Sequence, residues 1–280
     1  MAGLPLSPRE LAKRAAYTAY LKLKAPGETR RLGAENRQRV TVLCYHRVDD
    51  RLKDNVSLGV EQFERQMALL RRRYRVVRAD AIARGEVDRS SDRPIVAVTF
   101  DDGYRDNFTN ARPILNRHGV PATFFVATGF IGTERAFPHD LEKGLNDLPT
   151  MTWDQLRELA AEGHAIGAHT VNHLNIAEMG EAAAERELAE PLARIRSEIG
   201  VRDIAYAYCF GRKSDITPER RELARRIGYS ACFSAYGGTN TGAIDLFDIK
   251  RFGVNYGFSE TALRAKIEGC PFGGGAEASA

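Results

Sequence analysis

Short apolar runs alternate with helical stretches along most of this chain, and this alternation limits the folds that it can adopt. From Val40 onward, each strand-like run is followed by a segment with helical spacing or helix-capping residues. Such alternation is typical of parallel β units, in which a crossover helix joins neighbouring strands. We predict strands at 40–46, 94–101, 122–128, 164–169, 204–208, 229–233 and 246–252, and helices at 61–73, 111–118, 152–162, 181–199, 218–227 and 259–268. Seven strands are one short of a standard (β/α)₈ barrel.

The chain divides into three parts by composition. Residues 1–40 hold nine Lys/Arg and three Asp/Glu, whereas the remainder holds 32 and 34. A capping pattern at Ser7, Pro8 and Glu10 predicts a helix to about Lys24, which either packs on the main domain or contacts an anionic membrane peripherally. We therefore predict a basic helix and linker at 1–39, a catalytic domain at 40–269 and a disordered Gly/Ala/Ser tail at 270–280.

Composition also excludes several classes of protein. The main domain is almost neutral, so general nucleic-acid binding is not expected. The sequence contains no run of 18 apolar residues, so no membrane-spanning helix is expected. No signal-peptide core follows the first charges. Together these two features predict a cytoplasmic protein. The four cysteines form no C-x-x-C pair, which agrees with buried thiols in a reducing compartment.

Chemically reactive residues stand where the predicted strands end. Residues 99–104 read TFDDGY and place Asp101 and Asp102 before a glycine turn, and residues 169–173 read HTVNH. We expect one helical turn to bring His169 and His173 onto the same face. Two histidines and one carboxylate make a three-ligand metal site that leaves positions for water. The other carboxylate is then free to take a proton from that water.

These segments resemble the polysaccharide deacetylases, carbohydrate esterase family 4, which include chitooligosaccharide deacetylases. The resemblance covers about residues 40–265 and also rests on LCYHRV at 43–48, ATFFV at 122–126, TWDQL at 152–156 and RRIGY at 225–229. It implies a distorted (β/α)₇ barrel, with Asp101 as general base and Asp102, His169 and His173 as ligands of a divalent metal. Zinc suits such a ligand set best, and cobalt or nickel are alternatives.

Residues 207–211 read AYCFG and depart from the family's third motif, in which proline stands where this chain has Cys209. The resemblance assigns the oxyanion donor to the backbone N–H of Phe210, and Tyr208, Gly211 and Tyr104 to substrate contacts. The arginine that usually orients the base is absent, and Arg251 is the candidate to replace it.

The family's late histidine, its usual general acid, is also missing, because no histidine follows residue 173. His46, at the end of the first strand, is the best substitute. A Tyr-His pair there is typical of the branch that resembles poly-N-acetylglucosamine deacetylases.

The expected function is hydrolysis of the acetyl group of an N-acetylated, N-acetylglucosamine-type glycan. Three alternatives stay open: an O-acetyl sugar esterase, a carbohydrate-binding protein without turnover, and a nucleophilic pair formed by Cys44 and His46. The sequence does not determine the glycan or the oligomeric state.

Overall fold

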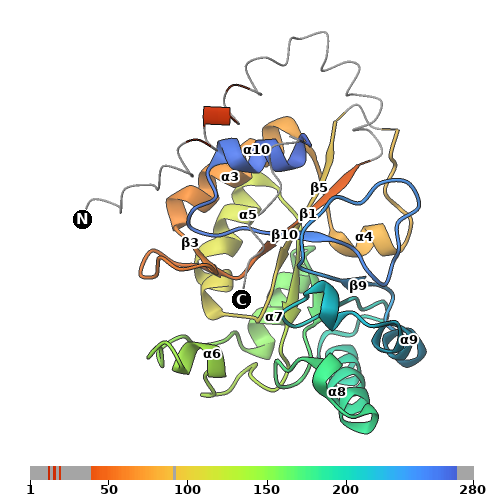
Figure 1. Ribbon diagram of the computed structural model, residues 1–280. Coiled ribbons are helices and arrows are strands. Elements are labelled where there is room, and N and C mark those ends of the chain that lie inside the picture. The colour runs from red at the N-terminus through yellow and green to blue at the C-terminus, as the bar shows by residue number, and fades with distance from the viewer. Residues whose placement is uncertain (1–11, 13–14, 17–18, 20–38, 91–92, 270–280) are drawn as a thin grey trace.

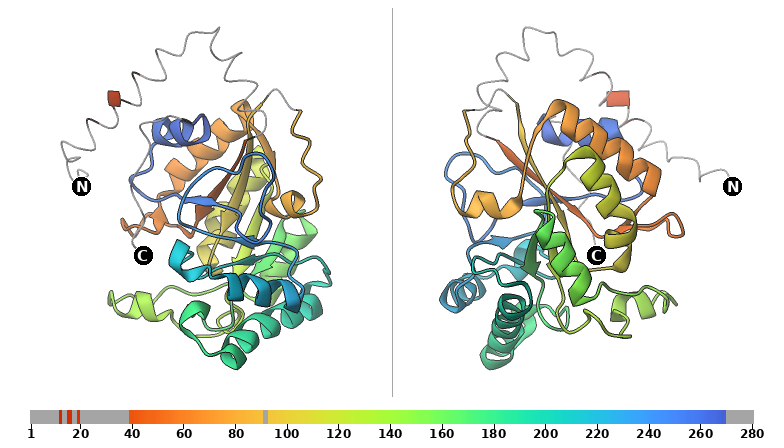
Figure 2. Two further views of the ribbon diagram at one scale, coloured as in Figure 1. Left: turned by 45° about the vertical axis from the view of Figure 1, so that its right-hand side comes forward. Right: turned by 180° about the vertical axis from the view of Figure 1, so that it is seen from behind.

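The computed structural model describes residues 12, 15–16, 19, 39–90 and 93–269, and its centre is a nearly closed barrel of parallel strands (Figure 1). The strands follow one another around the barrel in the order β10-β1-β5-β6-β7-β8-β9. Helices lie around the outside of these strands, as the turned view and the view from behind show (Figure 2). The strands span β1 Val40–Tyr45, β5 Ile95–Phe100, β6 Ala122–Val126, β7 Ala165–Ala168, β8 Tyr206–Ala207, β9 Cys232–Phe233 and β10 Arg251–Gly253. The predicted (β/α)₇ architecture is confirmed.

The barrel nearly closes through the segment that precedes β10. Ile249 forms a parallel bridge with Phe233 of β9, and β10 itself pairs with β1. The last strand was predicted at 246–252, but residues 246–249 are not a strand, because Asp245 and Phe247 form a turn there. The chain thus changes its partner from β9 to β1 within a few residues.

Several short elements were not predicted. β4 (Arg75–Val77) pairs with the first half of β5, and β6 pairs with the second half of the same strand edge. The helix α4 (Ala79–Ala83) follows β4 along the chain. A three-residue strand beside an arginine run has too little apolar pattern to be seen in the sequence. A further pair of two-residue strands, β2 (Arg47–Val48) and β3 (Ser57–Leu58), lies beside the barrel.

The long helices agree closely with the prediction. α8 (Glu181–Ile199) and α9 (Pro218–Ile227) match it to the residue, and Thr152 with Gln155 forms the capping box of α7 (Trp153–Ala161). The other α-helices of the described residues are α3 Val60–Arg73, α5 Arg112–His118, α6 Pro138–Leu141 and α10 Glu260–Ile267, of which α6 was not predicted.

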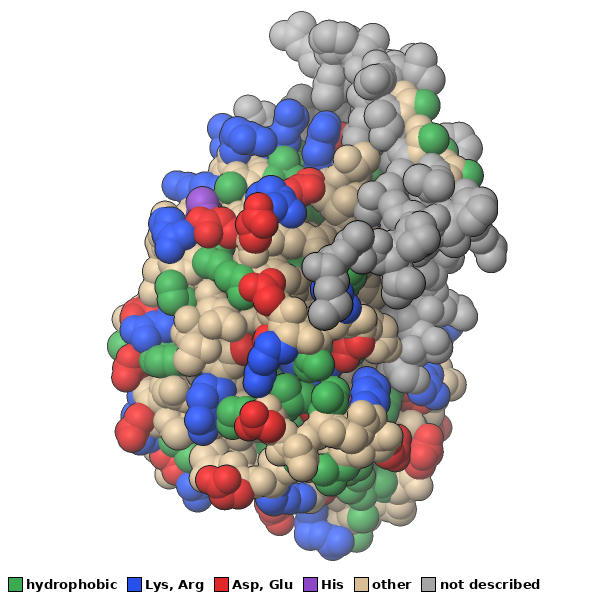
Figure 3. Space-filling view, turned by 90° about the vertical axis from the view of Figure 1, so that its left-hand side faces the viewer, with side chains coloured by type: hydrophobic (Ala, Val, Ile, Leu, Met, Phe, Trp, Pro, Cys, Tyr) green, Lys and Arg blue, Asp and Glu red, His purple; other side chains and the backbone are tan. Residues whose placement is uncertain are grey.

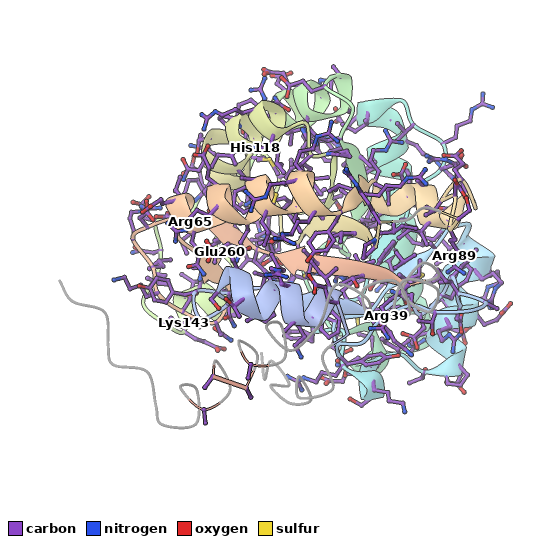
Figure 4. The ribbon with its side chains drawn as sticks, turned by 90° about the horizontal axis from the view of Figure 1, so that it is seen from above. Arg39, Arg65, Arg89, His118, Lys143 and Glu260 are labelled. Carbon is purple, nitrogen blue, oxygen red and sulfur yellow. The ribbon has the colours of Figure 1, made fainter. Side chains whose placement is uncertain are left out.

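The first and last long helices of the described barrel lie side by side. Figure 4 shows α10 along α3, with Arg65 and Glu260 between them, and the Arg65 Nε–Glu260 Oε1 distance is 2.7 Å. This pair is largely exposed, so its contribution to stability is small. The apolar side chains beneath it, including Phe63 and Leu263, are fully buried and join both helices to the barrel.

The surface agrees with a nearly neutral domain. Acidic and basic side chains are interspersed over the face seen in Figure 3, with hydrophobic side chains scattered among them. No helix among the described residues is both long and apolar enough to span a membrane. Most of the N-terminal extension and the tail from 270 lie outside the described residues, so the domain boundaries and the membrane contact stay predictions, although the four described alanines of the extension are helical.

Buried His164 predicts a measurable effect of pH on stability. Its Nδ1 accepts a hydrogen bond from the Ala122 amide and its Nε2 faces Asn116 Oδ1, both at 3.2 Å. Burial lowers the pKa of His164 to about 4, so between pH 6.5 and 4 the unfolded chain binds a proton that the folded ring does not. The free energy of unfolding should therefore fall by about 2 kcal/mol from pH 7 to pH 5 through this residue. Urea unfolding of His164→Gln should show a pH dependence weaker by that amount; an unchanged dependence would contradict the assignment.

Candidate active site

A cavity of about 140 Å³ opens where the carboxyl ends of the barrel strands meet. Residues that end or follow β1, β5, β7, β8 and β10 form part of its wall. In parallel barrels this end collects the catalytic residues, because the loops of several strands converge there. The cavity is lined by residues that include His46, Asp101, His139, His169, His173 and Phe210. Five of these six were predicted as site residues, and the structure brings them together.

Asp102 and the two histidines of the HTVNH segment converge beside this cavity. Asp102 Oδ1 lies 3.5 Å from Nε2 of His169 and 3.2 Å from Nε2 of His173. This carboxylate oxygen is buried and has no hydrogen-bond partner among the described residues. His169 Nδ1 lies 2.8 Å from the Ala207 carbonyl oxygen. Because a carbonyl oxygen only accepts, Nδ1 carries the proton of the neutral ring and Nε2 carries a lone pair. An unsatisfied buried carboxylate facing two imidazole nitrogens is a donor set that fits a divalent cation.

The segment from His169 to His173 is a loop, and the predicted helical turn was wrong. Thr170 and His173 have φ angles of 62° and 55°, which a right-handed helical turn does not permit. Glu187 of α8 holds the loop instead, because its Oε2 accepts hydrogen bonds from the amides of Val171 and Asn172, both at 2.9 Å. A buried carboxylate on a neighbouring helix therefore holds the loop that carries His169 and His173, which the spacing had predicted to be a helical turn.

Left-handed backbone conformations at non-glycine residues gather at this site. Among the described residues they occur at Asp102, Thr170, His173 and Phe210. Such conformations cost roughly 1–3 kcal/mol each and persist only where surrounding contacts impose them. Three of the four residues were predicted as metal ligands or as the oxyanion donor.

Arg251 holds the second carboxylate, Asp101, in a two-point ion pair. Arg251 Nη1 donates to Asp101 Oδ1 at 2.7 Å and Nη2 donates to Oδ2 at 2.8 Å, with both residues buried. Burial alone raises the pKa of Asp101, but the charge of Arg251 outweighs it and holds that pKa below its usual value. The geometry is the one predicted for an arginine that replaces the family's usual partner of the base, and Asp101 is ionised at neutral pH.

Cys44 and His46 stand beside Asp101 on the same side of the cavity. One ligand-type atom of each of these three residues lies within 4.8 Å of the other two. Cys44 Sγ donates a hydrogen bond to Asp101 Oδ2 at 3.3 Å, and burial raises the pKa of this thiol well above its usual value. A protonated thiol is a poor nucleophile, which argues against the alternative of a Cys44/His46 pair.

A short π-helical turn at Asn107–Ala111 positions His46 through its backbone. Asn107 is fully buried, and its Nδ2 donates a hydrogen bond to the His46 carbonyl oxygen at 2.7 Å. π-Helical turns are uncommon in proteins, but where they occur they often lie at functional sites. The His46 imidazole thereby lines the cavity from the end of β1.

The altered third motif retains a free backbone donor. Phe210 has a φ of 61°, and no hydrogen bond from its amide occurs among the described residues. Cys209 is buried, and its Sγ lies within 4.8 Å of the nearest ring nitrogens of His169 and His173. Tyr208 lines the cavity, whereas Gly211 packs against the Ala235 backbone, where an added Cβ would lie 2.6 Å from the Ala235 nitrogen.

Tyr104 does not line the cavity, contrary to its predicted contact with substrate. It is fully buried, and its hydroxyl donates to Asp140 Oδ2 at 2.6 Å and lies 3.0 Å from His139 Nε2. Arg47, also fully buried, donates to Asp140 Oδ1 at 2.8 Å. Sequence reasoning missed this network because Asp140 and His139 follow no strand and lie in the long connection between β6 and α7.

Comparison with known proteins identifies relatives of one kind. A family model described as polysaccharide deacetylase matches residues 88–232. A Bacillus subtilis (strain 168) protein named "Putative polysaccharide deacetylase YxkH" is 24% identical over 266 residues, which cover 94% of this chain and 88% of that protein. The chitooligosaccharide deacetylase of Rhizobium leguminosarum bv. trifolii is 36% identical over 102 residues, which cover 36% of this chain and 39% of that protein.

Solved structures share the fold. The deacetylase PplD of Streptococcus pyogenes, in complex with acetate, superposes with a TM-score of 0.67 at 21% identity and covers 82% of this chain and 98% of its own. IcaB from Ammonifex degensii superposes with a TM-score of 0.65 at 25% identity and covers 82% of this chain and 97% of its own.

The ligand assignment predicts how metal content responds to substitution. Asp102→Asn and His173→Ala should each lower the zinc bound per chain at a fixed free zinc concentration, because each removes one of three donors. Asp101→Asn should retain zinc, because Asp101 is held by Arg251 and is not among the three. Metal analysis after dialysis against a zinc buffer measures this, with His118→Ala on α5 as a control. Equal zinc loss in Asp101→Asn and Asp102→Asn would contradict the division of roles.

Proposed function

Because this chain belongs to the polysaccharide deacetylase family, we propose that it is a metal-dependent hydrolase that removes the acetyl group from an N-acetylated glycan. The observation that carries this proposal is the convergence of Asp101 and Asp102 with His169 and His173 at one cavity, together with the unpartnered Oδ1 of Asp102.

Asp102, His169 and His173 would hold the metal, and zinc suits two imidazoles and one carboxylate best. A divalent cation in such a site lowers the pKa of a coordinated water to roughly 7 and polarises the acetyl carbonyl. The orphaned oxygen of Asp102 and the free Nε2 of His169 support this ligand set.

Asp101 is the general base and takes the proton of the attacking water. A base must be ionised before the reaction, and the Arg251 guanidinium keeps it so despite its burial. The two-point contact also fixes the orientation of the carboxylate, so that little reorganisation is needed when the proton moves.

The Phe210 amide is the oxyanion donor. As water attacks the acetyl carbon, negative charge develops on the carbonyl oxygen, and a preoriented N–H group stabilises it. A backbone donor does not depend on the neighbouring side chain, so Cys209 in place of proline is compatible with this role.

His46 is the general acid that protonates the departing amine. An amine leaves poorly as an anion, so some acid must reach it. The His46 ring lines the same cavity as Asp101 and is placed through the contact of its carbonyl with Asn107. The products are acetate and a glycan with a free amino group.

The substrate class follows from the relatives rather than from the cavity. The names of the rhizobial relatives, chitooligosaccharide deacetylases, favour N-acetylglucosamine oligomers. An O-acetyl esterase would release acetate without a new amine, and a binding protein would release neither. Incubation with chitooligosaccharides and with O-acetylated sugars, followed by assays for acetate and for free amine, separates the three.

Substitution of the base tests the mechanism directly. Asp101→Asn should lower kcat on an N-acetylated oligosaccharide by a factor of 10² to 10⁴, because general-base catalysis is lost while the metal ligands remain. Arg251→Lys should have a smaller effect, since one positive charge stays but the two-point contact is lost. Acetate release by zinc-loaded protein measures both, and near wild-type turnover of Asp101→Asn would disprove its role as base.

The acid role of His46 predicts a dependence on the leaving group. His46→Ala should lower turnover of an N-acetyl sugar by about 10², the order expected for general-acid catalysis. An aryl acetate, whose phenolate leaves without a proton, should lose far less. Equal losses on the two substrates at unchanged zinc content would indicate that His46 only positions other groups.

A further inference from the structure

The connection between β6 and α7 brings a further histidine to the cavity. His139, on the short helix α6, lines the cavity, and its ring centroid lies 5.1 Å from that of the ligand His173. The ring stacks on Phe137 at a centroid distance of 5.3 Å, which fixes its plane. In Figure 1, α6 lies at the lower left, below the loop that carries β3.

The hydrogen bonds behind His139 have a fixed direction. Arg47 is fully buried and donates to Asp140 Oδ1, so Asp140 is an ionised carboxylate that can only accept. The Tyr104 hydroxyl, 2.6 Å from Asp140 Oδ2, must therefore donate to it. Tyr104 has no second hydrogen, so its 3.0 Å contact with His139 Nε2 requires that His139 be the donor.

This direction determines what His139 presents to the cavity. In a neutral imidazole the proton sits on one nitrogen, and here it sits on Nε2. Arg47 balances the charge of Asp140, the carboxylate behind the ring, and the hydrogen bond from Nε2 to Tyr104 fixes the tautomer. Nδ1 of His139 then carries a lone pair. No hydrogen bond reaches this nitrogen from the described part of the chain.

We propose that His139 is a substrate-binding residue whose Nδ1 accepts a hydrogen bond from a free hydroxyl group of the sugar. The proposal rests on the proposed deacetylase function and deepens it by naming a feature of the substrate. An acceptor nitrogen favours a hydroxyl and disfavours an ether or ester oxygen at the same position, since two acceptors without a hydrogen repel. The site therefore selects glycans in which the hydroxyl that meets Nδ1 is unsubstituted.

His139→Phe tests the contact while it retains a flat ring against Phe137. KM for an N-acetylated oligosaccharide should rise about tenfold, the usual effect of one lost hydrogen bond, while kcat changes little. His139→Asn places an amide oxygen near the position of Nδ1 and should restore part of the affinity. His118→Phe, at the end of α5 outside the cavity, should leave KM unchanged.

Monodeoxy analogues identify the hydroxyl and make the test specific. For one analogue, wild-type KM should rise about tenfold, and His139→Phe should add no further loss, because the contact is already absent. If His139→Phe raises KM by the same factor for every analogue, the residue has only a structural role and the proposal is overturned.

The tautomer can be measured without any turnover. Two-bond ¹H–¹⁵N correlation spectra of ¹⁵N-histidine-labelled protein should show His139 protonated at Nε2 and unprotonated at Nδ1, and Tyr104→Phe should change this pattern. A proton on Nδ1 in the wild type would overturn the proposal. If the protein released no acetate from any glycan, the deacetylase function would fail, and equilibrium binding of oligosaccharides to wild type and His139→Phe would still decide the role of His139.

Discussion

Arg251 donates hydrogen bonds to three residues at the ends of two other strands, and the closure and the chemistry of the molecule both depend on it. Its Nε donates to the Ser234 carbonyl just after β9, at 2.9 Å, and Nη1 also reaches Thr99 on β5 at 3.2 Å. The two contacts to Asp101 complete the set. A fully buried guanidinium is stable only when its donors are satisfied. The barrel therefore has to bring the ends of β5, β9 and β10 together, and the same requirement places an ionised carboxylate at the cavity.

A second buried arginine organises the residues behind His139. Arg47 is paired with Asp140 and also with Asp54, and its guanidinium carbon lies 5.2 Å from the centre of the Tyr104 ring. Removing one partner of such a cluster would leave an uncompensated buried charge, which is strongly destabilising. The two arginines thus hold groups of different kinds at one cavity: Arg251 holds a carboxylate near the strand ends, and Arg47 holds the Asp140–Tyr104 pair that contacts the imidazole on α6.

The departures from the usual family motifs become intelligible in this arrangement. The motif's missing arginine is matched by Arg251, which comes from another strand but meets Asp101 with the two-point geometry that a base-orienting residue needs. Cys209 changes a side chain, while the amide of Phe210, whose backbone is left-handed, has no hydrogen-bond partner within the described ranges. Strained backbone at four residues around the cavity is maintained by contacts such as those of Glu187 with the 169–173 loop.

Local pattern alone predicted much of this protein: the alternation of strands and helices, the exact bounds of α8 and α9, and the TFDDGY and HTVNH segments at strand ends. These features depend on neighbours in the sequence, so periodicity, capping residues and the rule for strand ends suffice to find them. Other features were decided only by the tertiary structure. They include the loop conformation of 169–173, the burial of Tyr104, and the position of His139, which reaches the cavity from a long connection. Each depends on contacts between residues far apart in the chain. Buried polar and charged groups must be paired, and local sequence patterns do not indicate which distant residue pairs with them.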